Sequence, residues 1–529
     1  MFTNKKTLLA MSVASVFALS GCSSDDDKND VVPDPIDPPV EVVVPPEAPA
    51  ELGAVVNGNV VDASSFDVVA STVMFYENGV ASTSLVDLDG NVLTSVETED
   101  GSFTFQLADD SDAESVTAIV MADGYVQKSF AIDLTQLSEG DLEVALSLTS
   151  LDSEGVAKQS VDASVSGGSS ADPITGGVAN GKATAAVTVP AGTQLQDANG
   201  DLITGESVSL SVTAADTSTT AGAAITPEGL NSAGATSVLT PVGVASVEMV
   251  DSNGVKVKKF SQPITVSMAI PADKGVSTGD MLTLVSQNED TGVWTTETQQ
   301  VEVKDLIADG SFYNASFETN HLTFFSAVSS QTSCSSAMRL LLNEQAPAGG
   351  LYVTVTSTDA GVGGYIKANS SEVTLISASS ASYYGISADA TAKVTVRDAS
   401  GNVWFASEGE VPVCGDVDVT LSAPVEYVDE TLSLTAQCSN DTDLNIPASG
   451  ALVKYSLSGK SKKVARPTGE AGQYALANLV SGQQYTVTVK YKDTLKSIGD
   501  KTYTITADGT AESQTEQLTC DVTTGVTGG

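Results

Sequence analysis

The sequence predicts an all-β protein built from tandem β-sandwich domains, and three observations support this. Short runs rich in Val and Thr alternate with polar residues, which is typical of half-buried strands. Gly, Asp and Asn separate these runs, and a turn motif of the form Asp-x-(Asp/Asn/Ser)-Gly recurs along the chain. Asp suits the first position of a type I turn, and the final Gly suits the left-handed residue that a hairpin needs there. The length of 529 residues is enough for about three or four domains.

The N-terminus has the layout of an export signal. Lys5 and Lys6 precede an uncharged, apolar stretch over residues 8–19. This stretch is shorter than the ~20 residues that a membrane-spanning helix needs. Residues 1–21 are therefore predicted to be a signal peptide that is removed after export.

The segment Leu-Ser-Gly-Cys that ends at Cys22 resembles a bacterial lipobox. The resemblance implies that Cys22 becomes the new N-terminus and is acylated, which would anchor the protein to a membrane. Ser23 follows the cysteine where an Asp tends to retain lipoproteins on the inner membrane, so the resemblance implies the outer membrane. Residues 22–52 hold seven of the 18 prolines and many acids, which predicts a disordered, extended stalk.

The charge balance excludes one class of partner. The chain has 24 Lys and Arg residues against 67 Asp and Glu residues, a formal net charge of −43. Such a surface repels nucleic acid, so no nucleic-acid partner is expected. The acid excess is compatible with calcium between domains, but none of the Asp-x-x-Gly turns has the twelve-residue spacing of an EF-hand. We therefore predict plain hairpin turns and no required cofactor at residues 87–90, 197–200, 251–254 and 398–401.

Residues 53–150 alternate clearly and contain "VETEDGSFTFQL" and "VTAIVMADGYVQKSFAIDL". This arrangement resembles the carboxypeptidase-regulatory-like domain. The resemblance implies a small transthyretin-like sandwich that is non-catalytic and serves as a spacer or adhesion module. Residues 151–183 contain "SGGSSADPITGGVANGK", and this composition predicts a Gly/Ser-rich linker.

Residues 184–330 begin with "AAVTVPAG", contain "PITVSMAIP" and end with His-Leu-Thr at residues 321–323. They resemble a group of sandwiches that includes the ankyrin and netrin-receptor domains and the autoproteolysis-inducing (GAIN) domains of adhesion receptors. The resemblance implies that Thr323 would be a nucleophile and His321 its base, with one cleavage between Leu322 and Thr323. The other interpretation is an ordinary closing strand, because residues i and i+2 share one face. The cysteines that brace the motif in adhesion receptors are absent, and both interpretations stay open.

Four cysteines remain if Cys22 carries lipid. An exported protein meets oxidising conditions, so an even remainder predicts two disulfides, with three connectivities open. We favour Cys334–Cys414 and Cys438–Cys520, because the spacings of 80 and 82 residues each match one small domain. Residues 331–425 and 426–529 would then be two disulfide-closed sandwiches. The second contains "GQYALANLVSGQQYTVTVKY" and again resembles a regulatory-like domain.

Ser277 lies in a Gly-x-Ser-x-Gly pattern at residues 275–279. That motif serves a hydrolase only at a strand-to-helix elbow, and the "DMLTLV" that follows is typical of a strand. A serine hydrolase is therefore a remote alternative. A single histidine and four paired cysteines also disfavour a transition-metal site.

The last domain carries nine of the 24 basic residues. One interpretation is a solvated face, and the other is a contact for an anionic polysaccharide or for acidic domains of neighbouring copies. The candidate binding residues are Lys454, Lys460, Lys462, Lys463 and Arg466.

Taken together, the sequence predicts a membrane-anchored cell-envelope lipoprotein of the outer membrane. It would act as a non-catalytic binding, adhesion or scaffold module, with a glycan or an envelope protein as ligand and with self-association open. The Ig-like or transthyretin-like sandwich is the expected domain type. The alternatives are a protein that cleaves itself once at Leu322–Thr323 and, more remotely, a hydrolase that uses Ser277.

Overall fold

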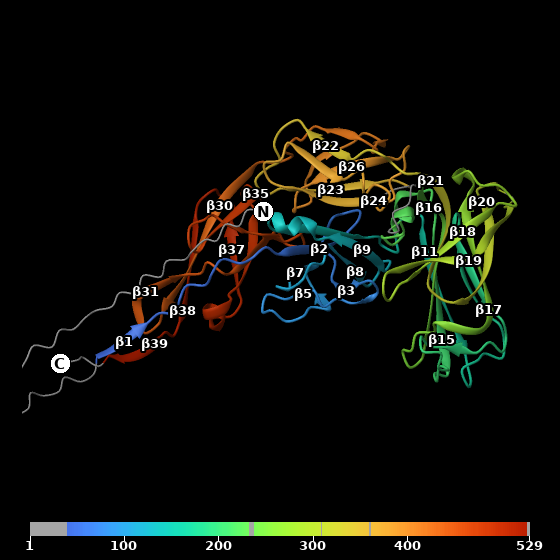
Figure 1. The fold of residues 1–529 in the computed structure, drawn as a ribbon, viewed down its shortest axis with the longest axis horizontal. Helices are drawn as coiled ribbons and strands as arrows, with labels where there is room; N and C mark the ends of the chain where they lie inside the picture. The colour runs from blue at the N-terminus through green and yellow to red at the C-terminus, as the bar shows by residue number, and fades with distance from the viewer. Residues whose placement is uncertain (1–39, 232–236, 308, 359–360, 526–529) are drawn as a thin grey trace, which may run out of the picture. The chain divides into compact units, whose positions relative to one another are not determined.

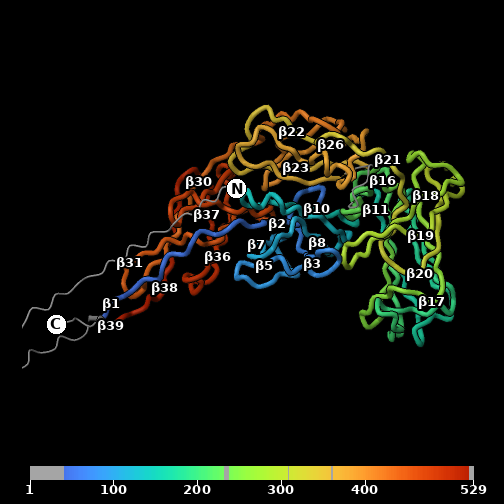
Figure 2. The backbone as a smooth tube through the Cα atoms, viewed as in Figure 1, coloured from blue at the N-terminus to red at the C-terminus, as the bar shows by residue number. Residues whose placement is uncertain are grey.

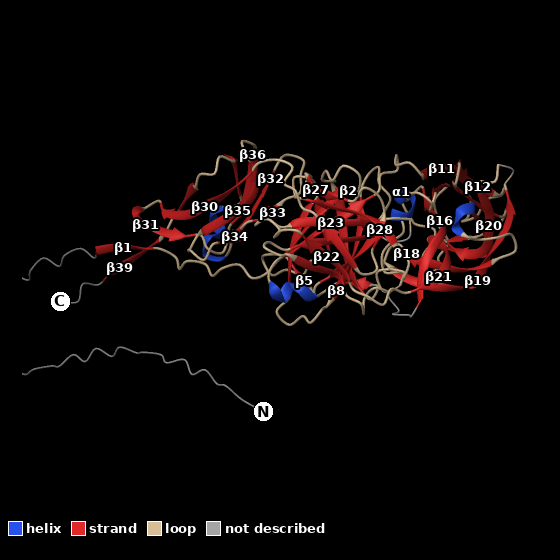
Figure 3. Cartoon of the chain, turned by 90° about the horizontal axis from the view of Figure 1, so that it is seen from above, coloured by secondary structure: helices blue, strands red, loops and turns tan. Residues whose placement is uncertain are grey.

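A computed structural model describes residues 40–231, 237–307, 309–358 and 361–525. Within these residues strands are the predominant secondary structure (Figure 1), which confirms the predicted all-β class. Figure 3 shows how few helical segments interrupt the strands. The helical segments are η1 (Thr135–Glu139), α1 (Thr220–Ala224), η2 (Ala272–Lys274) and η3 (Asp493–Ile498). None of the helices in the described ranges is long and apolar enough to cross a membrane.

The described chain divides into two compact units. One is a two-stranded ribbon in which β1 (Val40–Val44) pairs antiparallel with β39 (Asp521–Gly525). The other comprises residues Pro45–Cys520 and holds all four sandwiches. The predicted signal peptide and Cys22 lie outside the described residues.

The ribbon corrects part of the predicted stalk. Residues 22–52 were expected to be disordered, whereas Val40–Val44 forms a regular strand. Its sequence, Val-Glu-Val-Val-Val, has strong β propensity because of the branched side chains. The partner strand comes from the opposite end of the chain, so no local signal in the sequence indicated this pairing.

The first sandwich has two sheets, with strand orders β10-β2-β7-β5 and β4-β3-β8-β9, and β6 pairs with β3. Its core contains Phe75, which packs edge-on against Phe103 and Phe105 at 5.7 and 5.3 Å between ring centroids. The strands are β2 (Val56–Asp62), β3 (Ser71–Glu77), β4 (Val80–Ala81), β5 (Leu85–Val86), β6 (Ser95–Thr98), β7 (Ser102–Leu107), β8 (Ser115–Met121), β9 (Lys128–Asp133) and β10 (Leu142–Leu148).

The third sandwich has sheets β25-β22-β29 and β24-β23-β26-β27, with β28 on β26. The Cys334–Cys414 disulfide ties its first residues to the segment before its last strand. The strands are β22 (Met338–Leu342), β23 (Leu351–Thr356), β24 (Gly361–Ile366), β25 (Glu372–Ile376), β26 (Thr391–Arg397), β27 (Val403–Ala406), β28 (Val411–Pro412) and β29 (Asp416–Val419).

The fourth sandwich has sheets β31-β30-β35-β34, with β38 on β30, and β33-β32-β36-β37. The Cys438–Cys520 disulfide closes it, so both bridges join the pairs favoured from the sequence. The strands are β30 (Tyr427–Cys438), β31 (Asp441–Pro447), β32 (Leu452–Ser456), β33 (Lys463–Val464), β34 (Arg466–Pro467), β35 (Gln473–Val480), β36 (Gln484–Lys490), β37 (Lys501–Thr506) and β38 (Glu512–Leu518).

These three sandwiches repeat one topology. In each, the first strand pairs in parallel with the last: β2 with β10, β22 with β29, and β30 with β38. The strand that opens the other sheet, β3, β23 or β32, lies inside that sheet between two later strands. The chain is therefore an array in which one sandwich type occurs three times.

The second sandwich differs, because its eleven strands form one continuous sheet. The order is β11-β15-β16-β21-β18-β19-β20-β17-β13-β12, with β14 on β17, and the two halves of this path enclose a single core. The strands are β11 (Val156–Ser164), β12 (Ile174–Asn180), β13 (Ala183–Val189), β14 (Leu195–Gln196), β15 (Ser207–Ala215), β16 (Ser237–Asp251), β17 (Lys259–Pro271), β18 (Met281–Asn288), β19 (Val293–Leu306), β20 (Phe312–His321) and β21 (Phe324–Thr332).

The predicted linker at residues 151–183 is wrong for much of its length, because β11 and β12 belong to this sheet. Two of the glycines that suggested a flexible linker, Gly176 and Gly177, are tightly packed residues of β12. A Cβ on Gly176 would lie 2.7 Å from Leu210 Cδ2, and one on Gly177 would lie 2.9 Å from the carbonyl oxygen of Ala185. Glycine stands here because neighbouring atoms approach the backbone closely.

We expect Gly177→Ala to destabilise the second sandwich by about 1–3 kcal/mol, because the new methyl group must displace backbone rather than a flexible side chain. Thermal unfolding of the soluble chain measures this. Gly409→Ala is the matched control, since a Cβ there meets nothing within 4 Å. Equal unfolding temperatures for the two variants would contradict the packing argument.

Candidate functional site

A buried carboxylate joins three sandwiches. Glu143 on β10 is only 4% exposed. Its Oε2 accepts hydrogen bonds from Asn57 Nδ2 at 2.7 Å and from the Tyr352 hydroxyl of the third sandwich at 3.0 Å. Its Oε1 accepts from the backbone N–H of Val464 in the fourth sandwich at 3.4 Å. Because removing any of these partners would leave buried polar atoms unpaired, the joint holds the three sandwiches in one arrangement.

The five basic side chains predicted to contact an anionic ligand lie against other parts of the same chain. They pair as Lys460 with Asp67 at 2.5 Å, Lys462 with Asp100, and Arg466 with Asp141 at 4.0 Å. Lys463 donates to the Gly349 carbonyl and to the Tyr365 hydroxyl of the third sandwich. Lys454 is 8% exposed. The acidic domain that this patch contacts is therefore the first sandwich of its own chain.

The pKa values of Asp100 and Lys454 reflect the burial of side chains at this contact. Burial alone would raise the pKa of Asp100, but hydrogen bonds from Lys462 and Ser102 outweigh it and lower the pKa to about 2. Burial lowers the pKa of Lys454 to about 8, and the neighbouring charge of Lys462 acts in the same direction. Both shifts follow from packing the basic face of the fourth sandwich against the first.

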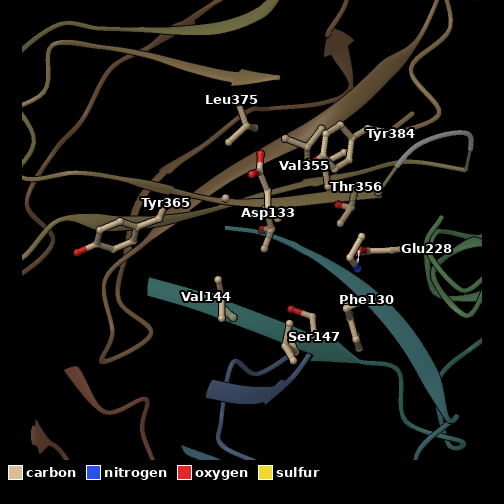
Figure 4. A pocket seen from close by; sticks show the side chains of 18 of the residues that line it. Phe130, Asp133, Val144, Ser147, Glu228, Val355, Thr356, Tyr365, Leu375 and Tyr384 are labelled. Carbon is tan, nitrogen blue, oxygen red and sulfur yellow. Dashed lines mark hydrogen bonds between the residues drawn. The ribbon is translucent and has the colours of Figure 1, made fainter. Parts of the chain in front are cut away.

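The first, second and third sandwiches together line an open cavity of about 790 Å³. Its volume is within the range of pockets that hold small ligands or short chain segments. Figure 4 shows strands of the first sandwich on one side, with Val144, Ser147 and Phe130, and strands of the third sandwich opposite. Glu228 of the second sandwich forms part of the remaining wall.

Edge strands line this cavity. Each of β9, β10, β24 and β25 is the outermost strand of its sheet. Consecutive residues from each line the cavity, for example residues 142–147 of β10 and 361–365 of β24. In the view of Figure 2, β10 lies beneath the sheet that contains β23 and β26. Consecutive lining residues show that these strands present their edges, with backbone N–H and C=O groups, rather than one face of side chains.

One wall contains a Lys–Glu pair. Lys128 Nζ donates to the Ala224 carbonyl at 3.0 Å, and Glu228 Oε2 accepts from the Ala131 N–H at 2.9 Å. Burial lowers the pKa of Lys128 and raises that of Glu228, while their mutual attraction opposes both shifts. Both side chains are half-buried and line the cavity. The pair therefore ties the first sandwich to the second at the cavity wall.

The opposite wall is the outer face of β26 and β23, with Thr354, Thr356, Lys393 and Arg397. Burial lowers the pKa of Arg397, whose guanidinium lies 5.9 Å from the centre of the Phe66 ring. Lys393 and Arg397 form no ion pair with any residue in the described ranges. This wall therefore offers two cations to an incoming group.

The His-Leu-Thr segment links two strands that pair with different neighbours. His321 ends β20, and Phe324 begins β21. The His321 ring nitrogens lie 3.0 Å from Thr319 Oγ1 and 3.2 Å from Glu297 Oε1. The Thr323 hydroxyl donates instead to the Gln287 carbonyl. The structure therefore does not bring the predicted base and nucleophile together.

Leu322 and Thr323 are both buried, at 3% and 5% exposed. Neither has a positive φ, and the peptide bonds of the described chain are all trans. The alternating pattern expected for one continuous closing strand is also absent, because the strand breaks at these two residues. The segment is a buried link without backbone strain.

Ser277 lies in an exposed turn, where its N–H donates to Asp280 Oδ2 at 2.8 Å. The strand β18 follows, so the strand-to-helix elbow of a hydrolase is missing here. No cluster of three or more His, Cys, Asp or Glu residues suited to a metal ion occurs in the described part of the chain.

The Asp-x-x-Gly motifs are hairpin turns, as predicted. Asp87 Oδ1 accepts from the N–H groups of Asp89 and Asn91, and equivalent bonds occur at Asp197 and Asp251. The carboxylates therefore stabilise their own turns. The final glycines are all left-handed: Gly90, Gly200, Gly254 and Gly401.

The contact between the first and second sandwiches holds a second buried carboxyl group. Glu289 is 9% exposed, and its carbonyl oxygen accepts from Gln127 Nε2 of the first sandwich at 2.8 Å. Burial, together with the negative charge of Glu248, raises the pKa of Glu289 to about 8. Ser246 Oγ donates to its Oε1 at 2.8 Å. Burial therefore favours the neutral form of this carboxyl group.

The comparisons with known proteins give structural neighbours only. No family model and no curated protein matches the chain. The Bacillus anthracis TIE protein is similar at 9% identity with a TM-score of 0.14, over 69% of this chain and 58% of that one. The minor pilin GBS52 of Streptococcus agalactiae is similar at 11% identity with a TM-score of 0.16, over 37% of this chain and 100% of that one.

The major pilin subunit BcpA of Bacillus cereus is similar at 9% identity with a TM-score of 0.14, over 88% of this chain and 99% of that one. The chain thus spans 58% of the length of the TIE protein. TM-scores this low carry no argument about function. The fold class is therefore assigned from the sheets of this chain.

We expect the free energy of unfolding to fall as pH rises from about 5 to 8, in part because of Glu289. The unfolded state releases this proton near the ordinary value of 4.5, whereas the folded state keeps it until about pH 8. The unfolded state therefore binds fewer protons in that window, which costs up to about 1.4 kcal/mol of stability per pH unit. Glu289→Gln should flatten this dependence and raise the melting temperature at pH 8.

Differential scanning calorimetry at several pH values measures this effect. Glu154→Gln, at an exposed position, controls for the general loss of one negative charge. An unchanged pH dependence in Glu289→Gln would show that Glu289 is ionised in the folded protein.

Proposed function

We propose that the protein is a non-catalytic binding and scaffold module of the cell envelope, anchored to the outer membrane through acylated Cys22. The observation that carries the proposal is the open cavity of about 790 Å³ lined by three sandwiches. Such interdomain cavities are common ligand sites. The array of sandwiches serves as the scaffold that positions this site.

A preformed cavity needs fixed walls, and the contacts between the sandwiches supply them. The buried bonds of Glu143 hold the first, third and fourth sandwiches together. The Lys128 and Glu228 contacts hold the second against the first. A ligand that enters such a site does not have to order it first, which favours binding.

The chemistry of the cavity supports binding rather than turnover. Its described lining residues include no histidine and no cysteine. The ionisable pair Lys128 and Glu228 is engaged with backbone groups. The self-processing alternative has no comparable support, because the Thr323 hydroxyl donates its hydrogen bond to the Gln287 carbonyl oxygen rather than to His321.

We expect Cys22→Ser to move the protein from the membrane fraction to the soluble fraction of its cells. Acyl chains provide the membrane affinity of a lipoprotein, and removing their attachment site removes that affinity. Fractionation followed by immunodetection measures this, and Ser23→Ala is the control that keeps the cysteine. Retention of Cys22→Ser in the membrane would contradict acylation as the anchor.

We expect a cavity-filling substitution, Thr354→Trp, to weaken saturable binding of the soluble chain, residues 23–529, to isolated cell envelopes by at least about tenfold, or 1.4 kcal/mol. Thr354 lines the cavity from the outer face of β23, an inner strand of its sheet. Thr354→Val is the control, because it removes the hydroxyl group without filling space. Circular dichroism checks that both variants fold. Binding that is unsaturable, or equal in both variants, would contradict a ligand site in the cavity.

A further inference from the structure

The ligand class follows from the polar groups of the cavity wall that have no partner within the described protein. Resting on the proposed function, we propose that the ligand is an uncharged oligosaccharide, which binds where Tyr383 and Tyr384 of the third sandwich lie near Asp133 of the first. Tyrosine rings offer an apolar surface to the CH face of a sugar ring. Sugar hydroxyls donate to carboxylates and accept from Tyr, Lys and Arg, so a sugar uses groups of both signs.

The contact between β10 and β24 closes one side of the cavity. A Cβ on Gly363 would lie 3.8 Å from the Ala145 carbonyl oxygen, so these two strands leave no space for a further chain. Figure 4 shows Tyr384, Asp133 and Glu228, from the third, first and second sandwiches, around the remaining space. The proposed site therefore lies beside the β10–β24 contact and not within it.

The two tyrosines stand on a loop that is anchored to the core of the third sandwich. This loop joins β25 to β26, and both tyrosines line the cavity. The ring centroids of Tyr383 and Tyr384 lie 5.0 Å apart, with an angle of 78° between the ring planes. Ala381 and Ile386 flank them and are buried in the core, and the Ile386 carbonyl accepts from the Cys334 N–H at 2.9 Å. The loop is thus fixed on both sides of the rings, which favours binding because less order is lost.

The hydroxyl groups of these tyrosines form no hydrogen bond with any residue in the described ranges. Burial raises the pKa of both Tyr383 and Tyr384, and the negative charges of Asp133 and Glu228 act in the same direction. Both hydroxyls therefore remain protonated donors. Asp133 Oδ1 accepts from the Thr135 N–H at 2.9 Å and from its hydroxyl at 2.6 Å, whereas Oδ2 has no partner in the described part of the chain. Two donors and one acceptor are thus available to a ligand.

The charges of the wall argue against an ionic ligand. Six carboxylates and four Lys or Arg side chains line the cavity. An anion would be repelled by the excess of carboxylates. A cation would be repelled by Lys393 and Arg397, while carboxylates such as Glu139, which pairs with Lys367 at 2.8 Å, are already engaged. An uncharged ligand is repelled by neither set.

The outer face of β23 and β26 adds hydroxyl groups to this wall. Thr354 stands opposite Thr395, and Thr356 stands opposite Lys393, in the register of the two strands. All four residues line the cavity. A threonine hydroxyl both donates and accepts, as a sugar hydroxyl does. A polyhydroxylated ligand can therefore be bound from this face as well as from the tyrosine loop.

Competition for envelope binding tests the ligand class with the soluble chain, residues 23–529. The probes are glycans released from the same envelopes and separated by anion exchange into an uncharged and an acidic fraction. The uncharged fraction should displace the chain and should slow hydrogen exchange in residues 377–385. Protease treatment of the envelopes should leave binding intact. Raising the NaCl concentration from about 0.05 to 0.5 M should change the dissociation constant by less than about twofold, because the ligand carries no charge.

Conservative variants locate the site. The double variant Tyr383→Phe and Tyr384→Phe keeps both rings and removes two donors, so it should weaken binding about tenfold. Asp133→Asn should weaken it by at least about fivefold, because a charged acceptor is lost. Tyr313→Phe and Asp123→Asn are the controls, at a half-buried tyrosine and an exposed aspartate outside the cavity, and should bind as the parent does. Circular dichroism checks that all four proteins fold.

The other occupants give different results. Displacement by the acidic fraction alone, or binding that weakens steeply with salt, would assign the cavity to an anionic ligand and overturn the proposal. Loss of binding after protease treatment would assign it to a protein and overturn it too. Weaker binding in Thr354→Trp, with no displacement by the uncharged fraction, would keep the cavity as a ligand site and reject only the sugar. Equal binding by the double tyrosine variant and Tyr313→Phe would reject the tyrosine loop as its site.

Discussion

In three of the four sandwiches the first strand pairs in parallel with the last. This pairing determines both the path of the chain through each sandwich and the position of its last strand. Parallel strands run in the same direction, so the chain enters each sandwich at one end and leaves it at the other. The last strand also remains at the edge of its sheet, as β10 does in the first sandwich. A free edge must be covered or used, because unpaired backbone groups attract other strands.

In the first sandwich, β24 of the third sandwich lies along the outer edge of β10. Glu143, near the start of this strand, is buried among Asn57, Tyr352 and Val464. Around this joint the chain places its scarce cations against acids of other sandwiches, as in the pairs of Lys460, Lys462 and Lys367. Exposed pairs are worth less than about 1 kcal/mol each. The buried bonds therefore fix the arrangement, while the ion pairs reduce repulsion in a chain with a net charge of −43.

Features that depend on local backbone geometry could be predicted from the sequence. The all-β class followed from alternation, and the hairpin turns from Asp and Gly at fixed offsets. Gly176 and Gly177 were wrongly assigned to a linker, because glycine occurs both in flexible loops and in crowded strands. The atoms packed against these two residues distinguish the two cases, and they come from segments distant in the sequence. The pairing of β1 with β39 and the partner of the basic residues depend on segments far apart in the sequence, so no local pattern could indicate them.

The cavity could not be predicted for a related reason. Its described lining residues include no histidine, cysteine or phosphate-binding motif. A search of the sequence for reactive residue types therefore does not detect it. Its distinctive property is topological: the outermost strands of four sheets meet around one space. The meeting of strand edges has a weak signature in residue identity, since every residue except proline supplies the same backbone N–H and C=O groups. Gly363 stands opposite Ala145, where a Cβ would lie 3.8 Å from the Ala145 carbonyl oxygen, so its small size lets β24 approach β10 closely.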